Sequence, residues 1–201
     1  NIAIKTFLSS IESDGLDETI IITPRKKDCD NSTTEINNII LNELIPDTSN
    51  QMQLGKKCFR VGAKVIQREN NYDKKVFNGE VGYITKIYDE DKGKEKIKKF
   101  SVKYKLGDSE KEIVYNRSEL DQIDLAYALT CHLAQGSGYK TVIAIIDNSH
   151  YIMLDSCLLY TMLTRAKKRC LLLSEPSAFI RCVNTNKGVD RQTWLKDMEL
   201  R

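Results

Sequence analysis

The stretch TIIIT, residues 19–23, decides the fold class. All five side chains are β-branched and none is charged, so both faces of the expected strand are suited to burial. A strand buried on both faces is typical of a parallel sheet covered by helices. Pro24 and Arg25 end the run, and a polar loop then leads to a second element. The stretch therefore predicts a strand–loop–helix unit of α/β type.

The helix expected after this loop has a start signal and a stop signal. The run STTE, residues 32–35, is a capping-box pattern with Ser32 as the N-cap and Glu35 as the third helical residue. Pro46 marks the end. Four apolar residues recur at helical spacing between these signals, namely Ile36, Ile39, Ile40 and Leu44. A further helix is expected over residues 3–11, before the strand.

The same alternation of strands and helices returns near the end of the chain. The expected elements are a strand at 63–67, a strand at 125–130, a short helix or turn at 131–136, a strand at 141–146, a helix at 158–166 and a strand at 170–173. Residues 176–201 read as a charged tail, helical around Trp194, to which no role is assigned. The pattern predicts one parallel-sheet domain interrupted by an insert.

The middle of the chain has a different texture from about residue 73. Short segments of alternating polarity are separated by Asn78-Gly79 and Gly107-Asp108, which predicts a small antiparallel barrel or meander. Residues 89–112 carry eight Lys and seven Asp or Glu, so a solvated hairpin surface is favoured over a phosphate-binding patch. The predicted domains are 1–72 with 124–201, and an insert at 73–123.

Composition sets wide limits on function. The 201 residues are 41% hydrophobic and 29% charged with a net charge of +3, so a basic surface must come from local clustering. Six cysteines without a C-x-x-C spacing disfavour a disulfide framework or a metal site and favour a reducing compartment. No signal peptide and no apolar run near 18 residues occur in the sequence, so we expect a cytoplasmic protein without a membrane partner. The chain lacks a starting Met and opens into a helix, as a piece of a longer protein would.

Polar stretches at the carboxyl ends of the expected parallel strands are the candidate site. They are residues 24–25, 130–137 and 147–150, and ligands gather at that edge of such sheets. A P-loop is absent; the nearest approach is Gly55-Lys56-Lys57, so we expect no ATP hydrolysis by this chain alone. Cys131 and His132 are neighbours and would point about 100° apart on a helix, which disfavours a thiol hydrolase.

Four cations lie within the run RAKKR, residues 165–169. Taken alone, they are best explained as the last turn of a helix, where positive charge stabilises the helix dipole by about 0.3 to 1 kcal/mol.

The motifs in their order resemble one known family. The runs are TPRKK, GAKVIQRENNYDKKVFNGEVGYI, LAYALTCHLAQGSGYKTVI and LLYTMLTRAKKRCLLL. Together they resemble the C-terminal motor domain of RecD-like superfamily 1 DNA helicases, including exonuclease V alpha subunits and TraA-type proteins, over about residues 17–175. The resemblance implies a RecA-like parallel-sheet domain of P-loop NTPase type, without the P-loop, interrupted by a small β-barrel of the Src-homology-3 (SH3) type.

The resemblance also implies roles at the nucleotide. ATP with Mg²⁺ would lie between two RecA-like domains, with the P-loop and the Mg²⁺ ligands in an N-terminal domain upstream of Asn1. The matching sixth helicase motif gives Arg165 the role of an arginine finger. The guanidinium suits this role because its planar donor fork and fixed charge match phosphate oxygens. Arg25 resembles a second arginine directed at the nucleotide, and Gln135 and Gly136 would lie near it.

Single-stranded DNA is the other implied ligand. Thr130, His132 and Ser137 match the part of the fifth motif that faces the strand. Asn70, Asn71 and Tyr72 form a further candidate contact, since an aromatic ring can stack on a base. Two departures weaken the expected DNA contact or coupling: Leu133 replaces the usual Lys or Arg, and Gly138 replaces the usual Glu.

The resemblance predicts a fragment of an ATP-dependent DNA helicase with 5′ to 3′ polarity, of the kind used in DNA repair and recombination. Two alternatives remain open at this point. One is a non-catalytic module that binds nucleic acid or protein. The other is an RNA helicase of the same superfamily.

Overall fold

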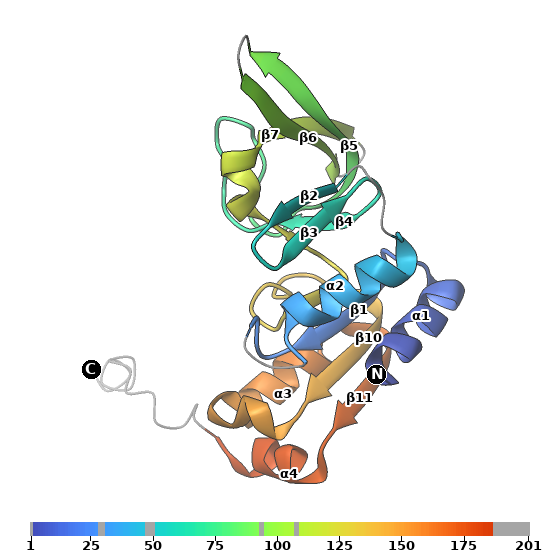
Figure 1. Ribbon diagram of the computed structural model, residues 1–201. Helices are drawn as coiled ribbons and strands as arrows, with labels where there is room; N and C mark the ends of the chain where they lie inside the picture. The colour runs from blue at the N-terminus through green and yellow to red at the C-terminus, as the bar shows by residue number, and fades with distance from the viewer. Residues whose placement is uncertain (1, 28–30, 47–50, 93–94, 107–108, 187–201) are drawn as a thin grey trace, which may run out of the picture.

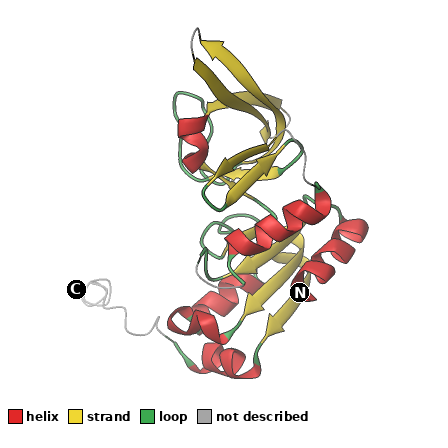
Figure 2. Ribbon diagram, in the orientation of Figure 1, coloured by secondary structure: helices red, strands yellow, loops and turns green. Residues whose placement is uncertain are grey.

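The computed structural model describes residues 2–27, 31–46, 51–92, 95–106 and 109–186. One half of the molecule is a parallel sheet with helices on both faces, and the other half is built from antiparallel strands (Figure 1). Figure 2 shows that the α-helices gather around the parallel sheet, while one short helix lies against the antiparallel strands. The predicted combination of an α/β domain with a small β insert is confirmed.

The parallel sheet has four strands in the order β11-β10-β1-β9. Their bounds are Ala166–Ser174 for β11, Tyr139–Ile146 for β10, Thr19–Thr23 for β1 and Ala128–Thr130 for β9. Ile22 of β1 pairs with Ala144 on one side and with Leu129 on the other. The burial of all five β1 residues is the pattern that predicted this central position.

Two helices cover each face of this sheet (Figure 1). Alternate strand residues point to opposite faces, so Ile21 and Ile143 pack with α1 (Ile2–Asp14) and α2 (Thr33–Leu44). Ile20 and Val142 pack instead with α3 (Ser156–Leu163) and α4 (Pro176–Asn184).

The predicted start of α2 is confirmed, because the Ser32 hydroxyl accepts from the Glu35 backbone N–H at 3.4 Å. One member of its predicted apolar face is not buried: Ile39 is 39% exposed, and Leu41 lies in the core instead.

The antiparallel half contains a five-stranded sheet and a hairpin. The sheet order is β7-β6-β5-β4-β8, and the hairpin joins β2 to β3. The bounds are β2 Gln51–Leu54, β3 Lys57–Arg60, β4 Lys64–Gln67, β5 Val81–Lys92, β6 Glu95–Leu106, β7 Ser109–Asn116 and β8 Ile123–Leu125, with a 3-10 helix η1 at Arg117–Gln122. Alternating burial in β7 follows the predicted period of two.

The strand expected at 63–67 does not join the parallel sheet. It is β4, which pairs antiparallel with β5 and with β8. All four of its residues are buried, and continuous burial in the sequence resembled a parallel-sheet strand. The antiparallel pairing therefore begins before residue 73, and the division at 73–123 stays a prediction.

The single strand expected at 125–130 is split between the two sheets. Leu125 ends β8, and Ala128 begins β9. The buried side chain of Asn37 on α2 stabilises this crossing: its Nδ2 donates to the carbonyls of Leu125 and Ala128 at 3.1 and 2.8 Å. Its Oδ1 accepts from the backbone N–H groups of Tyr127 and Ala128 at 2.9 and 2.8 Å. One amide thus satisfies four backbone groups where the chain passes from one sheet to the other.

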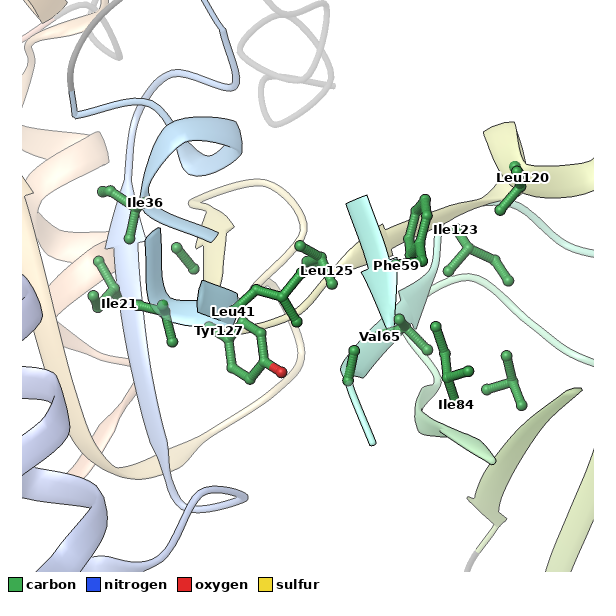
Figure 3. Close-up of a cluster of buried hydrophobic side chains, with 14 of the residues drawn as sticks. Ile21, Ile36, Leu41, Phe59, Val65, Ile84, Leu120, Ile123, Leu125 and Tyr127 are labelled. Carbon is green, nitrogen blue, oxygen red and sulfur yellow. The ribbon is translucent and has the colours of Figure 1, made fainter. Parts of the chain in front are cut away.

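A continuous apolar core joins the two halves. Figure 3 shows Leu125 between Ile21, Ile36, Leu41 and Tyr127 on one side, and side chains of the antiparallel half on the other. Polar contacts reinforce the junction, because the buried Lys64 ammonium donates to the Leu16 carbonyl at 2.8 Å.

The last predicted helix is shorter than its sequence pattern suggested. The spacing predicted residues 158–166, but α3 is Ser156–Leu163 with Thr164 as its C-cap. The following strand begins at Ala166 rather than at 170, so Lys167 to Arg169 lie on β11 and not in a helical turn. Helix α4 was not predicted, and the helix expected around Trp194 lies outside the described residues. Within the described ranges, no helix is long and apolar enough to cross a membrane.

Candidate functional site

A pocket of about 750 Å³ lies beside the carboxyl edge of the parallel sheet. Its walls come from the loop after β1, the loop after β9 and helix α3. The lining residues are Pro24, Arg25, Lys26, Lys27, Thr130, Cys131, His132, Gln135, Met153, Asp155, Cys157, Leu158 and Thr161. Two of the predicted polar stretches, 24–25 and 130–137, therefore meet in one pocket. The third stretch, 147–150, supports it, because Arg25 Nη1 donates to the Ser149 carbonyl at 3.3 Å.

The loop that follows Thr130 connects the two edges of the sheet. The Thr130 carbonyl accepts from the Ala134 N–H at 3.0 Å, which starts a compact turn. Gly136 has φ of 81°, a backbone conformation that favours glycine, and lets the chain turn back to the start of β10. His132 and Gln135 are exposed on this loop and line the pocket. The turn predicted at 131–136 is confirmed.

Cys131 does not form a nucleophilic pair with His132. Its side chain is buried, and burial raises the pKa of the Cys131 thiol, with the nearby Arg165 charge acting weakly in the opposite direction. A protonated, buried thiol is a poor nucleophile. The geometry agrees with the expectation against a thiol hydrolase.

Arg165 lies between α3 and β11 with a half-buried side chain. Its Nε donates to the Thr161 carbonyl at 3.2 Å and its Nη1 to the Ser137 carbonyl at 3.4 Å. Its Nη2 donates to the Thr164 hydroxyl at 3.3 Å. These bonds use three of the five guanidinium N–H groups and, among the described residues, involve no carboxylate. The group is held in place while it retains its full charge.

The backbones of Arg25 and Arg165 lie near opposite ends of the parallel strands. Arg25 follows the carboxyl end of β1, and Arg165 precedes the amino end of β11. Ala166, next to Arg165, pairs with Tyr139 at the start of β10, whereas Ile22 pairs with Ala144 further along that strand. Five residues of strand correspond to about 16 Å at a rise of roughly 3.3 Å per residue. This spacing is that of the backbone. The Arg165 guanidinium reaches back toward the pocket, because it donates to the carbonyl of Thr161, which lines the pocket together with Arg25. Arg25 shares the same pocket with Thr130 and His132.

Arg169 lies only four residues from Arg165, but its side chain helps to hold the elements of the fold together. Its guanidinium contacts the Asp14 carboxylate, and Lys140 Nζ lies 2.6 Å from the same group. Thr141 Oγ1 donates to Asp14 at 2.7 Å. These partners, the Lys140 bond first, lower the pKa of Asp14 well below its usual range. The cluster fastens the end of α1 to the starts of β10 and β11.

The predicted contact residues 70–72 lie on a loop of the antiparallel half. Asn71 Nδ2 donates to Gln122 Oε1 at 3.0 Å, so this side chain fixes the loop. Asn70 Oδ1 accepts from the Asn78 N–H at 2.9 Å. Tyr72 is 73% exposed and meets Phe77 edge to face with ring centroids 6.2 Å apart. None of the three residues lines the pocket that contains Thr130.

The two departures from the family motif have visible local consequences. Leu133 is half-buried, packs against the apolar core and lines a small cavity with Asn37 of α2 and Leu129 of β9. A side chain at Gly138 would have its Cβ 3.0 Å from Lys167 Cε. The Lys167 stem therefore occupies the space beside the position where the family usually has Glu.

One charged cluster was not predicted from the sequence. Lys26 Nζ, Lys57 Nζ and Arg68 Nε lie 2.6, 2.5 and 2.9 Å from the carboxylate of Asp124. Asp124 is only 8% exposed. The four residues come from four separate segments, and no local motif contains more than one of them. Only their meeting in the fold reveals the cluster.

His150 is a buried, neutral imidazole rather than a site residue. Its Nδ1 accepts from the Asp147 N–H at 3.2 Å, which leaves Nε2 to donate to the Thr23 hydroxyl at 3.4 Å. Burial lowers the pKa of His150. In the part of the chain that the structure describes, no three His, Cys, Asp or Glu side chains group as a metal site requires.

The fold and the pocket define a class: a RecA-like domain with an inserted SH3-like unit, of the kind found in helicase motors. Family models narrow the class. Residues 36–104 match the ATP-dependent RecD-like DNA helicase SH3 domain, and residues 125–173 match the UvrD-like helicase C-terminal domain. The chain therefore carries one segment that matches a RecD-like DNA helicase SH3 domain and one that matches a UvrD-like helicase C-terminal domain, as its motifs predicted.

Individual relatives agree with this assignment. An ATP-dependent RecD2 DNA helicase from Deinococcus radiodurans is 32% identical over 120 residues, which is 60% of this chain and 15% of that protein. The RecBCD enzyme subunit RecD from Buchnera aphidicola is 28% identical over 133 residues, 66% of this chain and 21% of that protein. The chain thus spans about a fifth or less of these curated relatives.

A solved structure shares the fold. The Pif1 helicase from Candida albicans superimposes with a TM-score of 0.56 at 16% identity, covering 90% of this chain and 50% of that one.

Proposed function

We propose that this chain is the second motor domain of an ATP-dependent DNA helicase with 5′ to 3′ polarity, and that Arg165 is its arginine finger. The observation that carries the proposal is the Arg165 guanidinium, held by carbonyl and hydroxyl oxygens without a carboxylate among the described residues. A retained positive charge in a fixed position is what a charge-stabilising residue needs. The matches to a RecD-like helicase SH3 domain and to a UvrD-like helicase C-terminal domain support the assignment of this arginine to a helicase motor.

The ATP would be held between this domain and a P-loop domain of the same protein, which would also supply the Mg²⁺ ligands. Phosphoryl transfer spreads negative charge over the γ-phosphate oxygens. Arg165 would stabilise that charge with the two guanidinium N–H groups that have no acceptor among the described residues. Gln135 and Gly136, on the loop beside it, would line the nucleotide's position. This chain without the P-loop domain would not hydrolyse ATP.

The loop after β9 would couple the nucleotide to the strand. Thr130 and His132 lie at its start, in the pocket at the carboxyl edge, and would contact single-stranded DNA. Ser137 lies at its end and accepts from Arg165 through its carbonyl. A shift of Arg165 would therefore be transmitted along one short loop. Arg25 lines the same pocket as Thr130 and His132, and we propose that it contacts the strand there. Asn70 and Tyr72 would add contacts from the insert, with Asn71 fixing their loop.

The test is the Arg165→Ala variant of a protein that contains both motor domains. Strand-stimulated ATP turnover is expected to fall by about 10³-fold or more, because an arginine finger contributes roughly that factor. Binding of nucleotide and of DNA, measured separately by fluorescence anisotropy, should change less than about twofold. Arg165→Lys should remain severely impaired, since the ammonium lacks the planar fork.

Lys167→Ala is the matched control, because it removes a neighbouring exposed cation of β11 and should leave turnover unchanged. Normal turnover in Arg165→Ala would remove this residue from the mechanism. It would favour the alternative function, a module that binds nucleic acid or protein without catalysis.

A further inference from the structure

We propose that the groove between the β1–α2 loop and the β2–β3 hairpin binds the phosphates of the same single strand that Thr130 and His132 contact. The inference rests on the proposed function and extends the strand's path from the motor domain onto the insert. The groove has a volume of about 480 Å³. Its lining residues are Lys26, Lys27, Thr34, Glu35, Leu54, Gly55, Lys56, Lys57, Arg68 and Asp121.

The groove carries a net positive charge. Five cations line it with the carboxylates of Glu35 and Asp121, and Asp124 pairs with three of the cations, so an excess of two positive charges remains. Asp124 neutralises only one of the three cations that share it. Lys56 is 82% exposed at the side chain and lies 4.0 Å from Glu35, a contact worth little in water. In a chain with a net charge of only +3, this groove is a local excess of positive charge.

Three of the five cations, Lys26, Lys57 and Arg68, are held in place by the Asp124 carboxylate. Lys57 Nζ also donates to the Ile123 carbonyl at 3.3 Å, and Arg68 Nη1 donates to the Asp121 carbonyl at 3.4 Å. Asn38 Nδ2 donates to the Lys56 carbonyl at 2.8 Å, which holds the hairpin turn against α2. Side chains that are already ordered lose little entropy when they bind an anion.

The groove is continuous with the candidate site. Lys26 and Lys27 line both the groove and the pocket that contains Thr130 and His132. A ligand that leaves the pocket past Lys27 therefore enters the groove. The shape is that of a track with cations at intervals, and a sugar–phosphate backbone repeats its charge along such a track. A free phosphate would need only one end of it, and an acidic peptide would have no reason to contact Thr130.

The test uses the salt dependence of strand binding to the 201-residue chain. Lys27, Lys56 and Arg68 are changed together to Gln, and an oligothymidine is titrated at several salt concentrations. The slope of log K against log salt is expected to fall in magnitude by about 2, because each lost phosphate contact removes roughly 0.7 for single strands. Affinity at about 0.1 M salt should drop tenfold or more.

The matched control changes Lys103 and Lys105 to Gln, which removes exposed cations from the antiparallel sheet outside the groove. It should alter neither the slope nor the affinity beyond about twofold. Equal losses in the groove variant and in the control would overturn the proposal, as would an unchanged slope in the groove variant. Binding of polyglutamate as tight as that of the oligothymidine would overturn the assignment to nucleic acid. Thermal unfolding of each variant confirms that it is folded.

A separate variant distinguishes failure of the groove from failure of the proposed function. His132→Ala should weaken strand binding while leaving the groove intact. If His132→Ala weakens binding and the groove variant does not, the groove proposal fails and the motor proposal stands. If the unaltered chain binds no strand at low salt, both proposals of strand contact fail.

Discussion

The cations at the two ends of the parallel strands have different partners. At the amino edge, Lys140 and Arg169 bind the Asp14 carboxylate and fasten α1 to β10 and β11. At the carboxyl edge, Arg25 binds a carbonyl, and Lys27 lines an open pocket. A carboxylate offsets one positive charge and orders the cations around it, whereas a carbonyl partner positions a cation without offsetting its charge.

Arg165 and Arg169 make the same point within one run of sequence. Arg169 contacts Asp14, and Arg165 donates to carbonyls and a hydroxyl. Four cations within five residues therefore include one that pairs with a carboxylate of α1 and one that, among the described residues, meets only carbonyl and hydroxyl oxygens. What separates them is the acceptor that each donor group meets, and that is set by the tertiary structure.

The largest expected effect on stability comes from Asn37, whose side chain holds the backbone where the chain passes from β8 into β9. Asn37→Ala leaves four backbone groups of the Leu125–Ala128 crossing without their side-chain partner. The free energy of unfolding should fall by about 3 kcal/mol, because buried unsatisfied polar groups cost roughly 1 to 3 kcal/mol each and partial relaxation recovers some of this. Urea denaturation measures the change.

Asn38→Ala, one residue further along α2, is the matched control. Asn38 makes an exposed bond to the Lys56 carbonyl and should contribute about 0.5 kcal/mol or less. Similar losses for both variants would contradict the role assigned to the crossing.

A smaller effect, present at neutral pH and lost in acid, is expected at the amino ends of the strands. The pKa of Asp14 is lowered in the folded protein, so the unfolded chain binds a proton at this residue more readily. The stability that Asp14 contributes is therefore fully present above its unfolded pKa of about 4 and is lost as the pH falls below that value. Asp14→Asn should be less stable at neutral pH and should show a shallower decline in stability between about pH 4 and pH 2. Parallel pH profiles for the two proteins would show that Asp14 is not coupled to the fold in this way.

The parallel sheet was predictable because burial there leaves a continuous signal. Residues 19–23 and 141–146 are apolar on both faces, and both form central strands. Strand β11 is an outermost strand of the sheet, and Lys167 to Cys170 are exposed. The start of β11 therefore has no continuous run of buried residues, and the predicted helix ran on into it. Strand β4 has the burial of a parallel strand but the partners of an antiparallel one. The burial of a strand can be read from the sequence, whereas the identity of the strand it pairs with cannot.

The candidate site was predictable in part for a related reason. Thr130, His132, Gln135 and Arg25 all follow strands of one sheet, and parallel topology brings them together. The backbone of Arg165 lies near the amino ends of the strands. Its position depends on where α3 ends, and periodicity placed that end three residues too late. The Asp124 cluster depends on how the insert packs on the motor domain, and no local pattern contains that information.

The central claim is that Arg25 serves the strand and Arg165 serves the nucleotide, and Arg25→Ala tests it most directly. In a protein with both motor domains, this variant should weaken single-strand binding by about fivefold to tenfold, in keeping with a lost phosphate contact. Its kcat at saturating strand and its KM for ATP should stay within about twofold of the unaltered protein. An Arg25→Ala protein that binds the strand normally and has lost turnover at saturating strand would contradict the account.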